Sequence, residues 1–205
     1  MDLIEFFQSG GPFMYAILAV MALGLAIAFE RFLYVSRTQG RTNKVWKKLS
    51  PMLQAKDYER AYNAVQSINT PIATVLQYGF SRHKAQAKRD LIDAAMEEGI
   101  MEVTPELEER THYLATLANV ATLLGLLGTI IGLIQAFTAV ANADPAEKAD
   151  LLSASISVAM NTTAFGLTAA IPLILIHSYI ATKTTRLVDN LEMAAVKCLN
   201  LICDE

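Results

Sequence analysis

Polar side chains recur at helical spacing inside two long stretches of the sequence that carry no charge. In the later stretch, Ser157 and Asn161 are four residues apart, and Thr162 and Thr163 follow directly. A helix can satisfy a hydroxyl at its own i−4 carbonyl, but a carboxamide in hydrocarbon needs a second helix or water as its partner. The group around Asn161 is therefore the most polar point of an apolar segment and a candidate contact for an ion or a polar ligand.

In the earlier stretch, Thr122, Gly125, Thr129 and Gly132 recur at i, i+3, i+7 and i+10, so a helix presents them on one narrow face. Gly128 and Gly132 add a GxxxG spacing on the adjacent flank. Because small residues let two helix backbones approach closely, we expect this face to meet protein rather than lipid. The residues that we assign to helix packing are Gly125, Gly128, Gly132, Gly166 and Pro172, the last of which permits a kink.

The middle of each uncharged stretch lacks the Asp or Glu that a proton-conducting membrane site ordinarily uses. If these residues line an ion path, a partner protein must supply the acid. A membrane enzyme is the least favoured class, because no nucleophile with a base, HExxH motif or phosphate loop occurs. We expect no cofactor and no metal, since the acidic residues between 97 and 109 follow one another without metal-site spacing and are typical of a solvated helix face.

The uncharged stretches also determine the fold class. The chain has 205 residues, of which 53% are hydrophobic and 18% charged, which is too apolar for an ordinary soluble domain. About 20 apolar residues cross a hydrocarbon core of about 30 Å. We predict an all-α integral membrane protein with three transmembrane helices, two of them long and extending into the cytoplasm, plus a helical cytoplasmic insert. Asp, Glu, Lys and Arg are absent between Glu5 and Glu30, between Arg110 and Asp144, and between Asp150 and Lys183.

The basic residues give the orientation. The segment 31–110 holds 13 of the 17 Lys and Arg, so the positive-inside rule puts it and the C-terminal tail in the cytoplasm. The predicted parts are a periplasmic segment (1–11), transmembrane helix 1 (12–35), a cytoplasmic helical insert (36–112), transmembrane helix 2 (113–141), a periplasmic loop (142–150), transmembrane helix 3 (151–182) and a cytoplasmic C-terminal helix (183–205). We expect the first span to remain as an anchor, because it lacks a basic start and a cleavage site.

Turn signals divide the insert into helices. Helical spacing is expected over 42–53, over 58–68 with Asp57 as its cap, over 72–80 and over 88–110. Cys198 and Cys203 follow in the tail, where glutathione keeps thiols reduced, and their spacing matches no common metal motif. We interpret both cysteines as packing residues rather than a redox pair.

The two polar stretches resemble a known pair of motifs. LLGLLGTIIGLIQAF, from Leu123 to Phe137, and ISVAMNTTAFGLTAAIP, from Ile156 to Pro172, are similar to the motifs of the MotA/TolQ/ExbB proton-channel family. The order of three spans, the large insert and the short outer loop agree over nearly the whole chain. The chain is closest to the ExbB and TolQ branch, because MotA-type stators have four spans.

The resemblance implies a homopentamer whose second and third helices line a central pore. In this family the pore holds a dimer of an ExbD- or TolR-like single-span protein, and each partner helix carries an Asp that is protonated in turn. The motif threonines that face this Asp match Thr129 and Thr163. Together with the polar residues of the third span, the predicted ion pathway is Thr129, Thr163, Thr162, Asn161 and Ser157.

The implied function is that of a ring-forming subunit in the bacterial inner (cytoplasmic) membrane. With its ExbD/TolR-like partner it would conduct protons down the proton motive force and power a TonB- or TolA-like transducer. The chain departs from the family at Val158, where ExbB and TolQ usually carry a Glu, at Thr122, which replaces a proline, and at His177-Ser178, which replaces Tyr-Asn. Hydroxyl-rich pores in related stators serve Na⁺, so H⁺ is the first interpretation and Na⁺ the second.

Two other functions fit some of the same residues. A secondary transporter subunit would bind its substrate at the level of Asn161, although the chain is short and has no inverted repeat. A non-conducting membrane scaffold would only hold partners together, and Val158 favours it because the ring then lacks a carboxylate of its own. No feature indicates a nucleic-acid partner.

Overall fold

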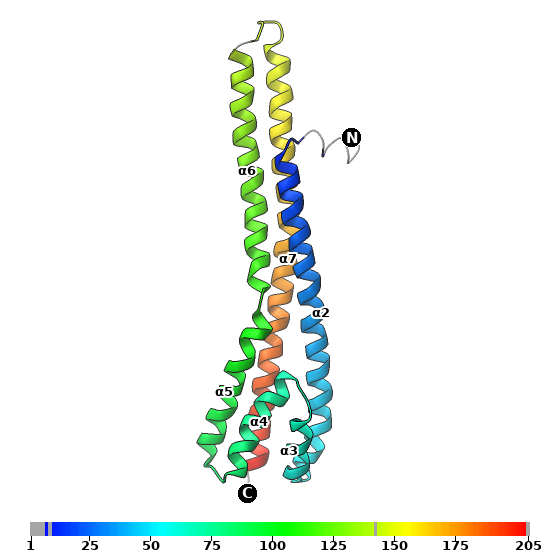
Figure 1. Ribbon diagram of the computed structural model, residues 1–205, viewed down its shortest axis with the longest axis vertical. Helices are drawn as coiled ribbons and strands as arrows, with labels where there is room; N and C mark the ends of the chain where they lie inside the picture. Colours follow the sequence, from blue (N-terminus) through cyan, green and yellow to red (C-terminus); the bar gives the residue numbers. More distant parts are fainter. Residues whose placement is uncertain (1–6, 8–9, 142, 204–205) are drawn as a thin grey trace. The chain divides into compact units, whose positions relative to one another are not determined.

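The described residues, which are 7, 10–141 and 143–203, are almost entirely helical in this computed structural model (Figure 1). No β-strand occurs among them. The all-α class expected from the sequence is therefore confirmed. The helices run over Phe13–Gln54 (α2), Tyr58–Gln66 (α3), Pro71–Lys84 (α4), Arg89–Glu108 (α5), Thr111–Ala141 (α6) and Lys148–Cys203 (α7).

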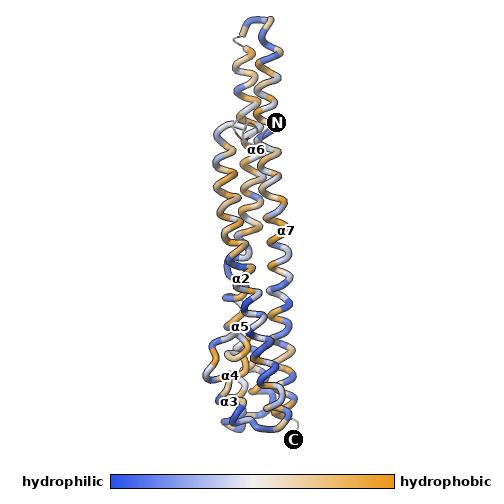
Figure 2. Tube along the Cα trace, turned by 90° about the vertical axis from the view of Figure 1, so that its right-hand side faces the viewer, coloured by the Kyte–Doolittle hydropathy of each residue, from blue (hydrophilic) through white to orange (hydrophobic). Residues whose placement is uncertain are grey.

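Among the described residues, three helical segments are long and apolar enough to cross a membrane: Phe13–Gln54, Arg89–Ala141, which includes α6, and Lys148–Cys203. Figure 2 shows hydrophobic residues along most of α6, and hydrophilic ones gathered where α3, α4 and α5 lie. The predicted spans at 113–141 and 151–182 lie inside α6 and α7, and the span at 12–35 lies inside α2 apart from Pro12. The 56 residues of α7 would measure about 84 Å at about 1.5 Å per residue, far more than a bilayer core requires.

Contacts between Cα atoms divide the chain into two compact units. We call Met1–Phe29 with Arg110–Tyr179 the apolar unit, and Glu30–Glu109 with Ile180–Glu205 the amphipathic unit. Each unit has its own core, and the continuous helices α2 and α7 contribute residues to both. The candidate pathway residues all belong to the apolar unit.

The core of the apolar unit consists mainly of small side chains. The buried residues of α6 are spaced three or four apart, which is the spacing of a helix-packing seam. The core joins α6 to α7 and to the start of α2. Its buried members are Ile17, Ala118, Ala121, Ala169, Ala170 and Leu173.

The core of the amphipathic unit consists of larger side chains. Leu49, Phe80, Met96 and Leu191 are all at most 2% exposed. The helices α4 and α5 cross where a Cβ on Gly79 would lie 2.1 Å from the Met96 Cε atom. This glycine therefore leaves room for a methionine in the core.

The insert helices follow the turn signals with one difference. Asp57 caps α3, because its Oδ1 accepts from the Arg60 backbone N–H at 3.2 Å, as the sequence predicted. The helix expected over 42–53 is instead the end of α2, which continues through Gly40. A helical glycine costs only about 1 kcal/mol, so it weakens the helix without ending it.

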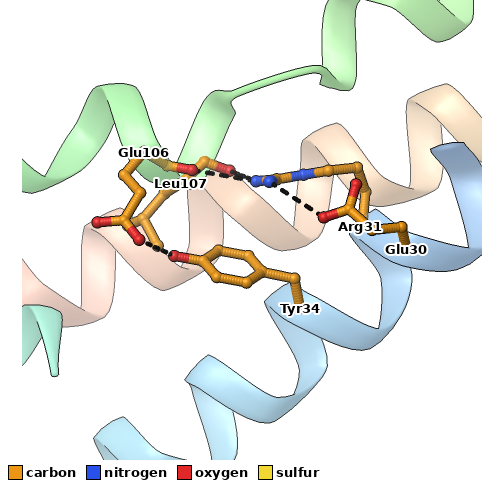
Figure 3. Close-up of polar contacts among 5 residues, drawn as sticks. All are labelled: Glu30, Arg31, Tyr34, Glu106 and Leu107. Carbon is orange, nitrogen blue, oxygen red and sulfur yellow. Dashed lines mark hydrogen bonds and ion pairs between the residues drawn. The ribbon is translucent and has the colours of Figure 1, made fainter.

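Arg31 joins α2 to the C-terminal end of α5 (Figure 3). The residue is 2% exposed, and its Nη2 donates to the Leu107 carbonyl at 2.7 Å and to the Glu106 carbonyl at 3.1 Å. The Tyr34 hydroxyl donates to the Glu106 carboxylate at 2.7 Å. A helix leaves its last carbonyls unpaired, and a cation there is favoured by the helix dipole, so Arg31 caps α5.

Candidate functional site

Thr163 links the two helices that carry the candidate pathway residues. It is half-buried on α7, and its hydroxyl donates to the Gly125 carbonyl of α6 at 2.8 Å. By contrast, the hydroxyls of Thr122, Thr129 and Thr168 bond within their own helices. Thr163 is therefore held in place by a helix other than its own.

The glycine face of α6 packs against α7 of the same chain. A Cβ on Gly125 would lie 3.2 Å from the Thr163 Cα atom, and one on Gly132 would lie 2.8 Å from the Ala159 Cβ atom. On Gly128 it would lie 2.4 Å from the Thr162 Cγ2 atom. The close approach at these glycines is made to another helix of the same chain.

The closest approach to backbone atoms in this crossing is at Gly166 on α7. A Cβ there would lie 2.8 Å from the Ala121 carbonyl oxygen and 3.0 Å from the Gly125 Cα atom. Both neighbours are backbone atoms, which cannot rotate away. Any side chain larger than hydrogen therefore forces the two helices apart.

Thr129 lies one helical turn beyond Gly125 on α6. It is half-buried, and its hydroxyl donates to the Leu126 carbonyl at 2.6 Å. Because Gly125 accepts from Thr163, the two motif threonines lie at neighbouring levels of the α6–α7 pair. Both hydroxyl protons bind backbone carbonyls, which leaves their oxygen lone pairs as acceptors.

The other candidates lie in different surroundings. Thr162 is only 2% exposed, and its hydroxyl lies 2.6 Å from the Gly10 carbonyl and 3.0 Å from the Val158 carbonyl. One proton cannot serve both acceptors fully, and the shorter contact ties α7 to the segment before α2. Asn161 is half-buried and Ser157 is exposed in the single chain.

The structure gives two contacts that sequence reasoning missed. The bond from Thr162 to Gly10 joins residues 152 positions apart, and the Arg31 cap joins residues 75 and 76 positions apart. No periodicity relates such distant residues. The only local signals were the Gly10-Gly11 pair before the first span and a charged pair, Glu30-Arg31, at its end.

Two residues singled out by the sequence lie on the outside of α7 in the single chain. Val158, where the ExbB and TolQ branch carries Glu, is 36% exposed. Pro172 is exposed, and α7 continues through it without a break. Neither side chain is part of the α6–α7 contact described above.

Comparison with known proteins identifies the family. The model of the MotA/TolQ/ExbB proton channel family matches residues 67–193, more than half of the chain. The chain belongs to this family. The matched region includes both motif segments and the helices α4, α5 and α6.

Individual relatives place the chain in the ExbB/TolQ branch. It is 31% identical over 199 residues to an ExbB homologue of Methanothermobacter thermautotrophicus that is named for biopolymer transport, covering 93% of this chain and 67% of the relative. It is 36% identical over 77 residues to the Tol-Pal system protein TolQ of Haemophilus influenzae, covering 38% of this chain and 33% of TolQ. It is 30% identical over 78 residues to the biopolymer transport protein ExbB of Aquifex aeolicus, covering 38% and 52%.

Family membership and the helices together define the broad class of the protein. It is a multi-pass membrane protein of an ion-channel and transport family rather than of an enzyme family. This agrees with the sequence, in which α6 contains no Asp, Glu, Lys or Arg. The polar groups available along α6 are hydroxyls, amides, the His112 ring and backbone carbonyls.

Proposed function

We propose that this chain is the ring-forming subunit of an inner-membrane motor driven by the proton motive force. In this proposal a single-span ExbD/TolR-like protein supplies an acidic residue at the level of Thr129 and Thr163. The ring and its partner conduct protons and drive a TonB/TolA-like transducer. The observation that supports it most is the pair of motif threonines at neighbouring levels of α6 and α7, both within stretches that lack Asp, Glu, Lys and Arg, in a chain of the proton channel family.

The hydrogen bonds of these threonines suggest which protonation state of the partner's acid they bind. Each hydroxyl proton binds a backbone carbonyl, to Gly125 for Thr163 and to Leu126 for Thr129, so each oxygen can accept without any movement. A protonated carboxyl donates and therefore fits this state. An ionised carboxylate needs a donor, which requires a hydroxyl to leave its carbonyl and rotate. The site thus favours the protonated acid and binds the carboxylate only after a rearrangement.

The orientation belongs to the same proposal. With residues 31–110 and the C-terminal tail in the cytoplasm, the N-terminus and the loop at 142–150 face the periplasm. The partner's acid would then exchange protons with the two sides as it passes the threonines. A homopentamer is the stoichiometry that the family resemblance suggests.

The test is ion flux through the reconstituted complex. The chain is co-purified with the single-span product of a neighbouring gene that has one intramembrane Asp, and is placed in vesicles under an imposed potential. We expect Thr163→Val to abolish proton flux while the complex keeps its mass, and Thr163→Ser to keep most of the flux. Thr122→Val is the matched control, since Thr122 is exposed on α6 and bonds only to its own helix at Ala118.

Three outcomes separate the alternatives. Wild-type flux in Thr163→Val vesicles refutes the role of the threonine. If the flux requires Na⁺ and is insensitive to the pH gradient, the conducted ion is Na⁺ and not H⁺. A complex of correct mass without ion flux supports the scaffold function, which Val158 favours by removing the ring's own carboxylate.

A further inference from the structure

Opposite charges are separated between two helices of the amphipathic unit. Residues 31–56 contain seven Lys and Arg and no Asp or Glu. Residues 90–109 contain eight Asp and Glu and no Lys or Arg. The first segment is mostly the second half of α2, and the second is α5 with the residue that follows it.

The basic residues of α2 form one line along the helix. Arg37, Arg41, Lys44 and Lys48 follow at i, i+4, i+7 and i+11, and all four are exposed. We call them the basic stripe. Among the described residues, none of the four has an ion-pair partner. Glu106 lines the same pocket as Arg41 but forms no ion pair with it. Four neighbouring cations without ion-pair partners repel one another, so an acidic surface would stabilise this face.

An acidic surface lies along α5 and α7. A groove of about 700 Å³ lies between these helices, and Asp93, Glu97 and Glu192 are among the residues that line it. Its apolar lining includes Met101 and Val196, which are 72% and 53% exposed. We call this the acidic groove. Within the described chain, Asp93 and Glu97 have no ion-pair partner either.

We propose that the basic stripe of one copy of this chain docks into the acidic groove of a second copy. This proposal rests on the ring of the proposed function and specifies which surfaces of neighbouring subunits meet. In Figure 1, α5 and the second half of α2 lie on different sides of α4 within the amphipathic unit. A contact between two different faces can repeat from copy to copy and close into a ring.

The height of the charges along the two helices agrees with this contact. Arg31 of α2 bonds the carbonyls of Glu106 and Leu107, which fixes a common level for the two antiparallel helices (Figure 3). Counting away from that level at about 1.5 Å per residue on both helices brings Lys44 to the level of Asp93. Rotation about the membrane normal keeps every residue at its own level, so copies in a ring bring these groups face to face.

The same count pairs the neighbours of Lys44. Arg41 reaches the level of Glu97, and Lys48 reaches that of Asp90. The aliphatic stems of Lys and Arg can cover the exposed Met101 while their charged ends reach the carboxylates. Gly40, beside Arg41, has nothing within 4 Å of a Cβ built on it, so a second helix can approach there.

Anionic lipid is the other surface that attracts a basic helix. Lys44 and Lys48 lie 13 and 17 residues beyond Arg31, which is about 20 to 25 Å along the helix. The attraction of a lipid surface falls off within a Debye length of about 8 to 10 Å. If Arg31 marks the end of the first span, these two lysines lie beyond the reach of the headgroups.

The main test is reversal of the charges and its rescue. In the full-length complex we expect Lys44→Glu with Lys48→Glu to reduce the fraction of full-size rings by about tenfold, because like charges then face each other. Asp93→Lys with Glu97→Lys should do the same, and all four changes together should restore assembly. The readout is the mass of the intact detergent-solubilised complex. The matched control is Arg82→Glu with Glu59→Lys, at exposed positions outside both surfaces.

A cross-linking experiment keeps the proposal testable if the reversed variants fold poorly. Lys44→Cys and Asp93→Cys are combined in a chain whose Cys198 and Cys203 are replaced by Ala. Oxidation should then give a ladder of covalent multimers. Cross-linked dimers alone would indicate a two-fold contact, and an unchanged monomer mass would indicate that the residues do not meet between copies; either result overturns the proposal.

The outcomes also separate this inference from the proposed function. A ladder in a complex without ion flux supports the interface and contradicts the motor. A conducting ring that gives no ladder and tolerates both reversals contradicts the interface and leaves the motor intact. If Lys44→Glu with Lys48→Glu assembles normally but loses bound phosphatidylglycerol, measured by mass spectrometry, the basic stripe binds lipid. That result also overturns the proposal.

Discussion

The single helix α7 contributes mostly small residues to one core and more large residues to the other, although Leu173 is buried in the first and Ala194 in the second. In the apolar unit its buried residues include Ala159, Gly166 and Ala169, whereas in the amphipathic unit they include Leu187 and Leu191. The spacing of three and four residues between buried positions is similar in both parts. The difference is therefore one of side-chain volume and not of helical pattern.

The solvent around each unit explains this difference. Between lipid tails a large apolar side chain gains nothing by facing another helix, so helices associate through close backbone packing and hydrogen bonds. In water, burial of apolar surface stabilises at about 25 cal/mol per Å², so larger side chains stabilise more. The apolar unit should therefore be sensitive to added volume, and the amphipathic unit to lost volume.

The largest effect is expected for an added methyl group at Gly166. A Cβ there meets backbone atoms of Ala121 and Gly125 at 2.8 and 3.0 Å, so Gly166→Ala should separate α6 from α7 and cost more than about 3 kcal/mol. Thermal unfolding in detergent micelles measures this loss of stability. Gly40→Ala is the matched control, because its Cβ meets nothing within 4 Å and the change should stabilise α2 by up to about 1 kcal/mol. Equal melting temperatures of the two variants would show that the helices are not in contact at Gly166.

The reverse change is expected to matter in the amphipathic unit. Leu191 is fully buried, so Leu191→Ala should destabilise the protein by about 3 kcal/mol through lost transfer energy and a cavity. Thr185→Ala, at an exposed position six residues earlier in α7, should change stability by less than about 0.5 kcal/mol. If Leu191→Ala were as mild as this control, the amphipathic unit would not depend on large buried side chains.

A smaller effect is expected at the end of α5. Arg31→Ala leaves the Glu106 and Leu107 carbonyls without the guanidinium donor and should cost about 2 kcal/mol. Tyr34→Phe removes only the bond to the Glu106 carboxylate and should cost about 1 kcal/mol or less. Hydrogen exchange of the last turn of α5 locates the effect. Unchanged exchange in Arg31→Ala would mean that the cap does not hold this helix end.

The smallest effect concerns a thiol and appears only at alkaline pH. Burial, and to a lesser extent the neighbouring Cys203, raises the pKa of Cys198 from 9.0 to about 12. Between these two values the unfolded chain loses a proton that the folded chain keeps, so stability falls as pH rises from about 9 to about 12 and is unaffected below. Cys198→Ala should remove this alkaline loss. At pH 8 a thiol reagent should modify the half-buried Cys203 and leave Cys198 unreacted until the protein unfolds; rapid modification of both would contradict the burial of Cys198.

The sequence was sufficient for the elements and for the family. The long uncharged runs predicted membrane-spanning helices. In the bilayer core the backbone N–H and C=O groups have no water to bind, and a helix pairs them within a single segment. The cap at Asp57 and the turn at Thr70-Pro71 followed from local chemistry. The motif around Thr129 and Thr163 was readable because it is contiguous within each helix.

The partners of the polar groups were decided only by the tertiary structure. A glycine face predicts that another helix packs closely against it, but not whether that helix belongs to the same chain. In the structure the packed helix is α7 of the same chain. The hydroxyl of Thr163 could have faced several neighbours, and packing directs it to the Gly125 carbonyl. Helical periodicity is a local property, whereas the pairing of Thr162 with Gly10, or of Arg31 with the end of α5, depends on how distant segments are brought together. The sequence by itself therefore determined the helices and which faces must be covered, and the tertiary structure decided what covers them.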